Sequence, residues 1–324
     1  MNAGAQDLLA LPDLDAIRAA AARIGPYVHL TPVLRCSAID AEVGARLHFK
    51  CENFQKVGAF KARGACNAVF SLEDDVARRG VVTHSSGNHG AALAYAAAQR
   101  GIPSWVVMPE NAPQVKQENV RRFGATIRLC KPTVAAREAA CADVERETGA
   151  ELVHPFDDVR VIAGQGTATL ELLDALPRLD IVIAPVGGGG LLSGTAIAAT
   201  SIRRGIRVFG AEPANADDAA RSFRSGAVEP LPNATTIADG LRTTVSPRTL
   251  AALRAHVAAI GTASEDGIVR AMRMIWERMK IVVEPSSAVP LACLLERTLD
   301  VTGADVGIIV TGGNVDLDRL PWQR

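Results

Sequence analysis

The sequence lacks the features that mark nucleic-acid-binding proteins. Aromatic residues make up only 4% of the 324 residues, so few side chains could stack on bases. Lys and Arg together number 35, and so do Asp and Glu, which leaves no net charge to attract nucleic acid or an anionic membrane. We therefore expect neither a nucleic-acid partner nor a membrane surface as a partner.

Disulfide signatures and long hydrophobic runs are also missing. The six cysteines form no CxxC pair and no spacing typical of a disulfide framework, which favours small buried thiols in a reducing compartment. No apolar stretch is long enough to span a bilayer, and the start of the chain lacks a signal-peptide pattern. We expect a soluble, cytoplasmic protein, long enough to divide into two lobes.

Two common nucleotide-binding motifs are absent from the most glycine-rich stretch, residues 181–195, IVIAPVGGGGLLSGT. A dinucleotide fingerprint needs a glycine at its sixth position, which is Ser193 when counted from Gly188. A P-loop needs a lysine before Ser or Thr, but Thr195 directly follows Gly194.

What this stretch does contain is a strand-like run, a glycine turn and a helix-like segment. Residues without a Cβ let a ligand approach the backbone, and a helix N-terminus favours an anion. The turn therefore predicts a phosphate site, with a flexible loop as the alternative. Its glycines are Gly187, Gly188, Gly189 and Gly190.

Strand-like and helix-like segments alternate along the chain, and several strands are apolar throughout, which indicates an α/β fold with parallel sheets. We predict a crossing between lobes at residues 151–166, where this alternation breaks. The predicted strands are 47–50, 81–83, 105–108, 126–129, 151–153, 181–183, 207–210 and 306–310. The predicted helices end at residue 24 or cover 60–70, 91–100, 115–123, 134–148, 167–176, 191–199, 216–224, 247–254 and 265–280.

Three further segments carry polar groups next to glycines. Lys61 follows Phe60 in a small-residue segment, so it is either a desolvated, nucleophilic amine or part of a basic helix face. Residues 83–90, THSSGNHG, offer donors to a carboxylate or cap a helix. Residues 311–314, TGGN, follow the apolar C-terminal strand and either share a cleft with the glycine run or form a plain turn.

Eight motifs occur in the order found in serine racemase and the short threonine/serine dehydratases, which are fold-type II pyridoxal phosphate enzymes. They are GAFKARGA, THSSGNHG, IAGQGT, PVGGGG, AEPANADD, IADG, ERMK with EPSSA, and TGGNVD. The chain resembles this family over residues 29–316, nearly its whole length. The resemblance implies a tryptophan synthase β-like fold of two lobes, each with a mostly parallel sheet flanked by helices. Residues 1–70 and 157–324 would form the large cofactor-binding domain, and residues 71–156 the small substrate-gating domain.

The resemblance also implies roles around pyridoxal 5'-phosphate. Lys61 would form a Schiff base with the cofactor, and Phe60 would pack on its ring. Asn88 would bond the ring hydroxyl, and Thr311 would face the pyridine nitrogen and leave it largely unprotonated, which favours loss of a β-leaving group. The cofactor's phosphate would lie on Gly187, Gly188, Gly189 and Gly190.

Substrate-binding residues follow from the same resemblance. Arg137 would reach the distal side of the substrate, and Asp239 matches a position linked with it. Ser86 would act as a catalytic residue on the face of the α-carbon opposite Lys61. The substrate carboxylate would be received by Ser85, Ser86, Gly87, Asn88 and His89.

A divalent cation is the second cofactor that the resemblance implies. Glu212, the carbonyl of Ala216, and Asp218 match positions that hold such an ion, and all-oxygen ligation suits Mg²⁺, Mn²⁺ or Ca²⁺. The alternative is an ordinary acidic helix start at residues 217–218.

These roles predict an ammonia-lyase that dehydrates L-threonine, L-serine or threo-3-hydroxyaspartate to a 2-oxo acid, with serine racemisation as the alternative. Phe156 stands where serine racemase has asparagine, and this departure favours dehydration. Two alternatives come from other classes of protein. A nicotinamide-dependent dehydrogenase fits the α/β pattern, but the dinucleotide-binding fingerprint is missing. An amino-acid sensor without catalytic activity would not need Lys61. The family suggests a homodimer acting on small amino acids.

Overall fold

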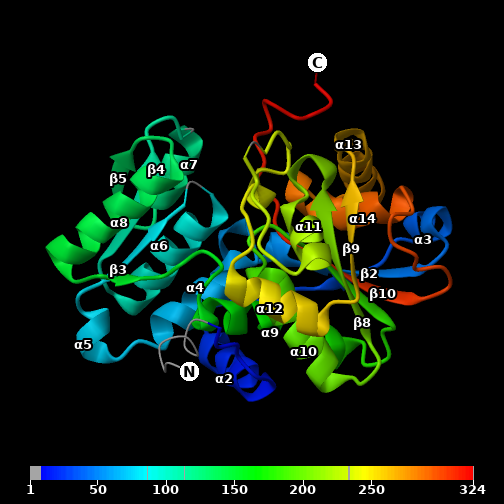
Figure 1. Cartoon of the computed structure of the whole chain (residues 1–324), viewed down its shortest axis with the longest axis horizontal. Coiled ribbons are helices and arrows are strands. Elements are labelled where there is room, and N and C mark those ends of the chain that lie inside the picture. Colours follow the sequence, from blue (N-terminus) through cyan, green and yellow to red (C-terminus); the bar gives the residue numbers. More distant parts are fainter. Residues whose placement is uncertain (1–8, 86, 113, 233, 324) are drawn as a thin grey trace.

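The structure is a computed structural model that describes residues 9–85, 87–112, 114–232 and 234–323. The chain forms two lobes, each built around a β-sheet with helices on both faces (Figure 1). The α/β architecture with two mainly parallel sheets is thus confirmed.

The larger sheet has the strand order β1-β2-β10-β7-β8-β9. Only the β1–β2 pair is antiparallel, and the remaining neighbours run parallel. Their bounds are β1 (Val33–Leu34), β2 (Arg46–Cys51), β7 (Ile181–Pro185), β8 (Arg207–Pro213), β9 (Ala259–Ala263) and β10 (Asp305–Val310).

Strand β7 shows why this sheet is apolar on both sides. Ile181 and Ile183 face a core shared with α13 (Glu265–Met274) and α14 (Pro285–Leu295). Val182 and Ala184 face a second core, because successive side chains of a strand point to opposite faces. That second core is completed by α9 (Val159–Ala175), α10 (Gly190–Ile202) and α12 (Pro247–His256).

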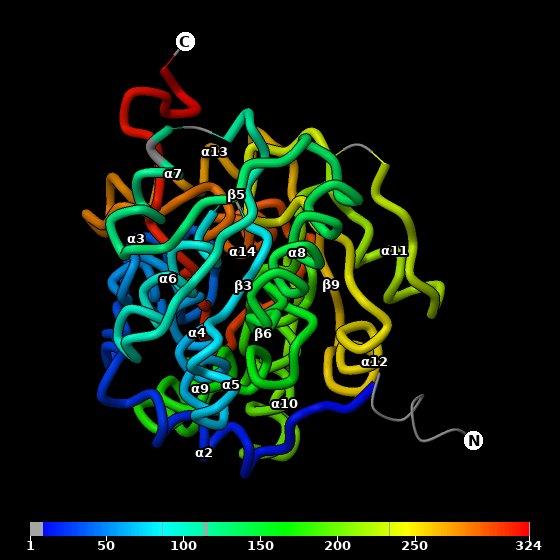
Figure 2. The backbone as a smooth tube through the Cα atoms, turned by 90° about the vertical axis from the view of Figure 1, so that its left-hand side faces the viewer, coloured from blue at the N-terminus to red at the C-terminus, as the bar shows by residue number. Residues whose placement is uncertain are grey.

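The smaller sheet is parallel throughout, in the order β5-β4-β3-β6. Helix α6 (Asn88–Arg100) packs on the face that carries Val106, and α8 (Val134–Thr148) on the face that carries Val107. Figure 2 shows these two helices on either side of β3. The strands are β3 (Val81–His84), β4 (Ser104–Pro109), β5 (Thr126–Cys130) and β6 (Glu151–Leu152), with α7 (Gln114–Arg121) beside α6.

Helix α4 (Lys61–Phe70) joins the lobes, since it packs against both α6 and α9. A Cβ on Gly164 would lie 2.6 Å from the Cα of Gly64, so α4 and α9 approach backbone to backbone. The other helices are α2 (Leu14–Ile24), α3 (Ser37–Val43), α5 (Asp74–Ala77) and α11 (Asp218–Ser225), with short turns η1 (Glu52–Phe54), η2 (Lys56–Gly58), η3 (Ala214–Ala216) and η4 (Asp239–Leu241).

Two sequence predictions need correction. The crossing at residues 151–166 is shorter, because α9 already begins at Val159, where Asp158 caps it by accepting from the N–H groups of Arg160 and Val161. The helix predicted to reach residue 280 leaves the α-helical pattern after Met274, and the π-helical turn η5 (Ile275–Met279) follows it. Within the described part of the chain, no helix is both long and apolar enough to cross a membrane.

Candidate functional site

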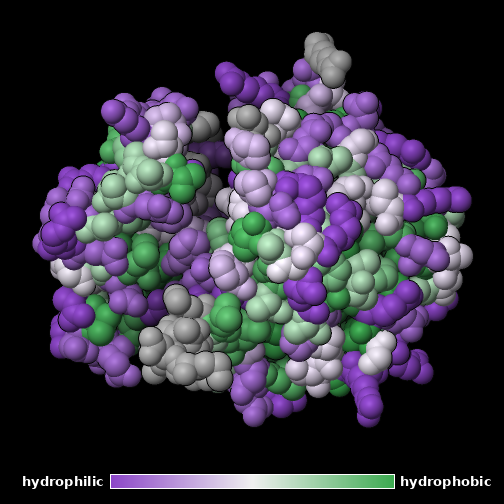
Figure 3. Space-filling model, in the orientation of Figure 1, coloured by the Kyte–Doolittle hydropathy of each residue, from purple (hydrophilic) through white to green (hydrophobic). Residues whose placement is uncertain are grey.

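The predicted site residues gather where the parallel strands end. Strand β7 leads into the glycine run, β10 leads into Thr311, and α4 starts at Lys61 beside them. The N–H of Phe60 donates to the carbonyl of Thr311 at 2.9 Å, which fixes the start of α4 against the end of β10. The space-filling view shows a hollow in the surface between the two lobes (Figure 3).

Lys61 has the environment of a nucleophilic amine. Its Nζ donates to the carbonyl oxygen of Pro155 at 2.7 Å and lies 5.2 Å from the centre of the Phe60 ring. Loss of hydration lowers the pKa of Lys61 to about 8, against a smaller opposing effect of Glu284. Of the two alternatives that the sequence left open for Lys61, these contacts favour a desolvated amine over a basic helix face.

The glycine run lets neighbouring side chains pack directly on its backbone. A Cβ on Gly188 would lie 2.3 Å from the Phe156 ring, and one on Gly189, whose φ is +89°, would lie 2.7 Å from the Thr249 side chain. No side chain caps the N-terminus of α10, which begins at Gly190. Its first N–H groups and the helix dipole therefore suit an anion such as a phosphate.

Asn88 is held across the gap between the lobes. Its Nδ2 donates to both oxygens of Glu284, at 3.0 and 3.1 Å, and its Oδ1 accepts from Asn314 at 2.9 Å. Burial raises the pKa of Glu284 to about 7, a rise that Asp239 reinforces and Asn88 opposes. Glu284 was not predicted as a site residue, although it begins the EPSSA motif and stands directly before the Pro285 that starts α14.

Thr311 is buried and its hydroxyl has a fixed partner. Its Oγ1 lies 2.9 Å from the Oγ of Ser287, which also donates to the carbonyl of Gly312 at 2.7 Å. A neutral hydroxyl, rather than a carboxylate, therefore lies at the end of β10.

The segment after β3 is only partly described. The Oγ of Ser85 accepts from the N–H of Gly87 at 3.2 Å, and Ser86 lies outside the described residues. The ring of His89 turns inward, where its Nε2 donates to the carbonyl of Val153 at 3.2 Å. Burial holds the pKa of His89 well below its usual range, so this neutral ring is occupied within its own lobe.

Arg137 and Asp239 have separate partners. Arg137 lies in the first turn of α8, donates to the carbonyl of Thr133 at 3.4 Å, and helps burial to lower the pKa of His84 at the end of β3. Asp239 forms an ion pair with Lys116 of α7, which bridges the lobes. In this structure Asp239 therefore pairs with Lys116, and its expected link with Arg137 stays a prediction.

The three predicted metal ligands lie at the end of β8 and the start of α11. Glu212 and Asp218 are fully buried, and Oδ1 of Asp218 has no hydrogen-bond partner among the described residues. Burial raises the pKa of Glu212 to about 9 and that of Asp218 to about 6. Two buried carboxylates with a vacant oxygen fit a cation, although no cluster of three acidic, His or Cys side chains forms within the described residues.

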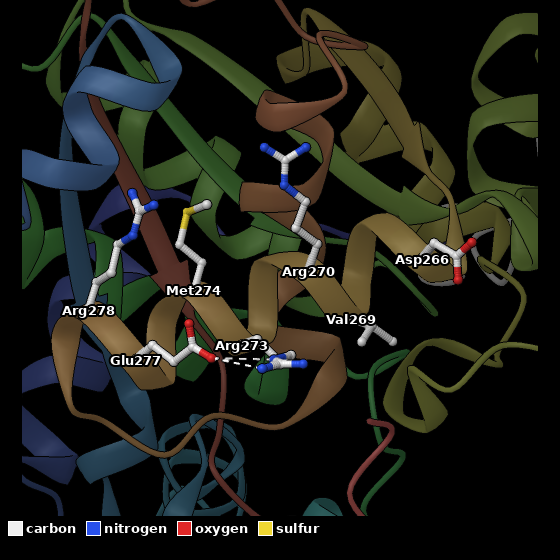
Figure 4. A pocket seen from close by; sticks show the side chains of 7 residues that line it. All are labelled: Asp266, Val269, Arg270, Arg273, Met274, Glu277 and Arg278. Carbon is white, nitrogen blue, oxygen red and sulfur yellow. Dashed lines mark hydrogen bonds and ion pairs between the residues drawn. The ribbon is translucent and has the colours of Figure 1, made fainter. Parts of the chain in front are cut away.

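A cavity of about 410 Å³ lies elsewhere, on the outer helix α13 and its π-helical end (Figure 4). Its charged side chains are partly paired, with Arg273 donating to Glu277 at 3.1 Å. None of the predicted site residues is among those that line it: Asp266, Val269, Arg270, Arg273, Met274, Glu277 and Arg278.

A desolvated lysine, a glycine run at a helix N-terminus and a buried hydroxyl thus lie together at the ends of neighbouring parallel strands. Residues 24–312 match the family described as "Pyridoxal-phosphate dependent enzyme", and the chain belongs to that family.

Individual relatives are similar over nearly the whole chain. The β-hydroxyaspartate dehydratase of Paracoccus denitrificans (strain Pd 1222) is 50% identical over 313 residues, covering 97% of this chain and 99% of the relative. A serine racemase of Oryza sativa subsp. indica is 50% identical over 316 residues, covering 96% and 93%. The solved structure of maize serine racemase superposes with a TM-score of 0.93 at 48% identity, covering 95% of each chain.

Proposed function

We propose that the chain is a pyridoxal-phosphate-dependent dehydratase that converts β-hydroxy amino acids to 2-oxo acids and ammonia. The observation that carries this proposal is the Lys61 amine, partly deprotonated at neutral pH, beside a glycine cradle for a phosphate. The dehydratase relative at 50% identity supports the reaction type.

The cofactor, when bound, supplies an electron-withdrawing ring conjugated to the substrate's α-carbon. Lys61 would hold it, Phe60 would lie against it and Asn88 would bond its hydroxyl. The phosphate would accept from the backbone of residues 187–190, and Thr311 would face the ring nitrogen. The Ser287 partner of Thr311 supports this last role, because it leaves no carboxylate there to hold a proton on that nitrogen.

The protein's own groups then account for the proton transfers. The free amine of Lys61 would take the α-proton, since its pKa of about 8 lies near neutral pH. The proton then held on Lys61 would leave with the β-hydroxyl as water, and the released enamine would take up water and split into a 2-oxo acid and ammonia.

The substrate would be bound mainly by the small lobe. Its carboxylate would be received by Ser85, Ser86, Gly87, Asn88 and His89, with His89 acting through its backbone because its ring bonds Val153. Arg137 would pair with a distal carboxylate, as in 3-hydroxyaspartate. We propose residues 71–156 as the gating domain and residues 1–70 with 157–324 as the cofactor domain.

A second candidate is racemisation of serine, which the similarity to rice serine racemase favours. Ser86 would then deliver a proton to the opposite face of the α-carbon. Incubating the purified protein with L-serine, L-threonine and L-threo-3-hydroxyaspartate separates the two activities. D-serine forming faster than any 2-oxo acid would reverse the order.

The Lys61→Ala variant tests the proposed site directly. We expect turnover to fall by at least about 10³-fold, because both the covalent attachment and the base are lost. Borohydride should fix the cofactor to the native protein and to a Lys56→Ala control, but not to Lys61→Ala. Retention of a reducible adduct, or normal turnover, would reject the site.

We also propose a divalent cation, Mg²⁺ or alternatively Mn²⁺ or Ca²⁺, on Glu212, the carbonyl of Ala216, and Asp218. Oδ1 of Asp218, which has no hydrogen-bond partner among the described residues, supports this site.

A cytoplasmic homodimer remains our expectation. Phe54 and Val282, each more than 40% exposed, lie on segments joined by the Asn53 Nδ2 bond to the Val282 carbonyl, and such an apolar surface supports self-association. Sedimentation would measure its extent.

A further inference from the structure

The six-residue connection between β6 and α9, residues 153–158, touches the main parts of the site. The carbonyl of Pro155 accepts from Lys61 at 2.7 Å. The next residue, Phe156, lies so close to Gly188 that a Cβ there would meet its ring at 2.3 Å. The position of this connection therefore sets both the direction of the amine and the shape of the glycine cradle.

His154 closes the connection into a turn. Its Nδ1 accepts from the N–H of Asp157 at 2.9 Å and lies 3.4 Å from the N–H of Phe156. A ring nitrogen that accepts carries no proton, so His154 is the neutral form protonated at Nε2. Arg248 secures the far end of the turn by donating to the Asp157 carbonyl at 3.0 Å.

The ring itself packs against two other aromatic rings. It packs edge to face on His84, at the end of β3, with ring centres 5.3 Å apart. It also packs edge to face on the Phe156 ring, with ring centres 4.6 Å apart. The imidazole thus has a fixed orientation, and Nδ1 is directed at the backbone.

We propose that His154 is a positioning residue, which holds the 154–157 turn through Nδ1 so that Pro155 faces Lys61 and Phe156 covers the glycine run. The inference deepens the proposed function and rests on it for the identity of the cofactor and the reaction. The hydrogen bond and its effect on the turn belong to the protein alone.

Burial is the main cause that keeps the ring in the accepting form. Burial lowers the pKa of His154 to about 4, and the neighbouring His84 and Lys61 add to that lowering, while Asp157 and Asp158 oppose it. Buried His89 faces the same group from α6. A proton on Nδ1 would point at the Asp157 N–H and break this hydrogen bond. Because the pKa of His154 is about 4, we expect the turn to persist at every pH well above that value.

The test compares two amides that differ by one methylene. In His154→Asn the acceptor oxygen sits on Cγ, as Nδ1 does, and can still reach the Asp157 N–H. In His154→Gln the oxygen lies one carbon further out and misses it. We expect His154→Asn to keep the cofactor dissociation constant and kcat within about threefold of the native protein, and His154→Gln to lose about tenfold in both, the usual result of stranding one buried donor.

Hydrogen–deuterium exchange of the Asp157 amide gives a readout that needs neither cofactor nor substrate. Protection should be retained in His154→Asn and lost in His154→Gln. His154→Leu keeps the bulk without an acceptor and should behave like His154→Gln. His48→Leu, which removes a buried histidine near the start of β2, is the control and should leave exchange and cofactor binding unchanged.

Equal protection and equal cofactor binding in the Asn and Gln variants would overturn the proposal. So would damage to His154→Asn as large as that to His154→Gln, since the imidazole would then act through Nε2. A native protein that binds no pyridoxal phosphate would instead reject the proposed function, while the exchange comparison would still decide whether His154 holds the turn.

Discussion

Glu284 is a buried acid placed opposite the Lys61 amine, and its ionisation affects stability as well as the site. Its pKa rises from 4.5 to about 7. Between these values the folded protein keeps a proton that the unfolded chain has lost, so stability falls as pH rises through this window. The protonated form is therefore the one that folding favours.

Replacing Glu284 with Gln should remove this slope. The amide keeps an acceptor for Asn88 but cannot ionise, so the variant should lose less stability than the native protein between pH 5 and pH 8, by about 1–3 kcal/mol. Denaturant unfolding at the two pH values measures the difference. Glu277→Gln, at a side chain that is 64% exposed, is the control. Parallel pH curves for native protein and Glu284→Gln would show that Glu284 does not titrate in this range.

At the same scale, sequence analysis found the residues that adjoin glycine turns and missed those defined by distant partners. Lys61, Asn88 and Thr311 stand beside recognisable motifs. Glu284 meets Asn88 across 196 positions of the chain, and its chemistry arises only where the two lobes meet. The proposed role of His154 likewise depends on a backbone turn, and no sequence motif indicates that turn.

At the scale of elements, the glycine run is a turn on which the Phe156 and Thr249 side chains pack directly. A Gly188→Ala methyl would have to displace the Phe156 ring, which lies 2.3 Å from its position. We expect at least about tenfold weaker cofactor binding, with a smaller change in the unfolding of the cofactor-free protein. Fluorescence titration with pyridoxal phosphate measures it.

The matched control is Gly25→Ala, at the end of α2. There the new methyl would be 3.4 Å from the nearest atom, an ordinary contact, and φ is −47°. Unchanged cofactor affinity in Gly188→Ala would mean that the Phe156 ring moves without cost and that the cradle tolerates a side chain.

A cation at the junction of β8 and α11 would tie these elements together. Glu212 comes from the strand and Asp218 from the first turn of the helix, and without a cation burial and the neighbouring Asp218 raise the pKa of Glu212. We expect Mg²⁺ in excess over its dissociation constant to raise the melting temperature, and EDTA to reverse the gain. In Asp218→Asn the gain should vanish. A Mg²⁺ effect equal in native protein and variant would place the ion elsewhere.

Periodicity predicted most strands of the two sheets, because buried parallel strands are apolar throughout. It did not find α14, whose described positions from Pro285 to Leu294 are all buried and therefore show no polar face. Pro290 inside that helix further hides it. The start of α9 was missed for a related reason: Gly164 and Gly166 suggest a loop, but they serve its close packing on α4 and α10.

At the scale of the whole molecule, polar side chains join the two lobes beside the proposed site. Asn88 reaches Glu284 and Asn314, and Lys116 reaches Asp239. Helices α6 and α7, which carry Asn88 and Lys116, lie within residues 71–156, the proposed gating domain. If that domain opens to admit substrate, these contacts would have to break.

The Lys116–Asp239 pair allows this point to be measured. Its side chains are 33% and 45% exposed, so water screens the attraction, and such pairs contribute about 0–1 kcal/mol. We expect Lys116→Met and Asp239→Asn each to raise KM by less than about fivefold with little change in kcat, and the double variant to match either single one, because removal of one partner already breaks the pair. High salt screens the ion pair, so it should raise the KM of the native protein towards that of the variants. If Asp239→Asn instead lowers kcat sharply while Lys116→Met does not, Asp239 acts on the substrate itself and the ion pair is incidental.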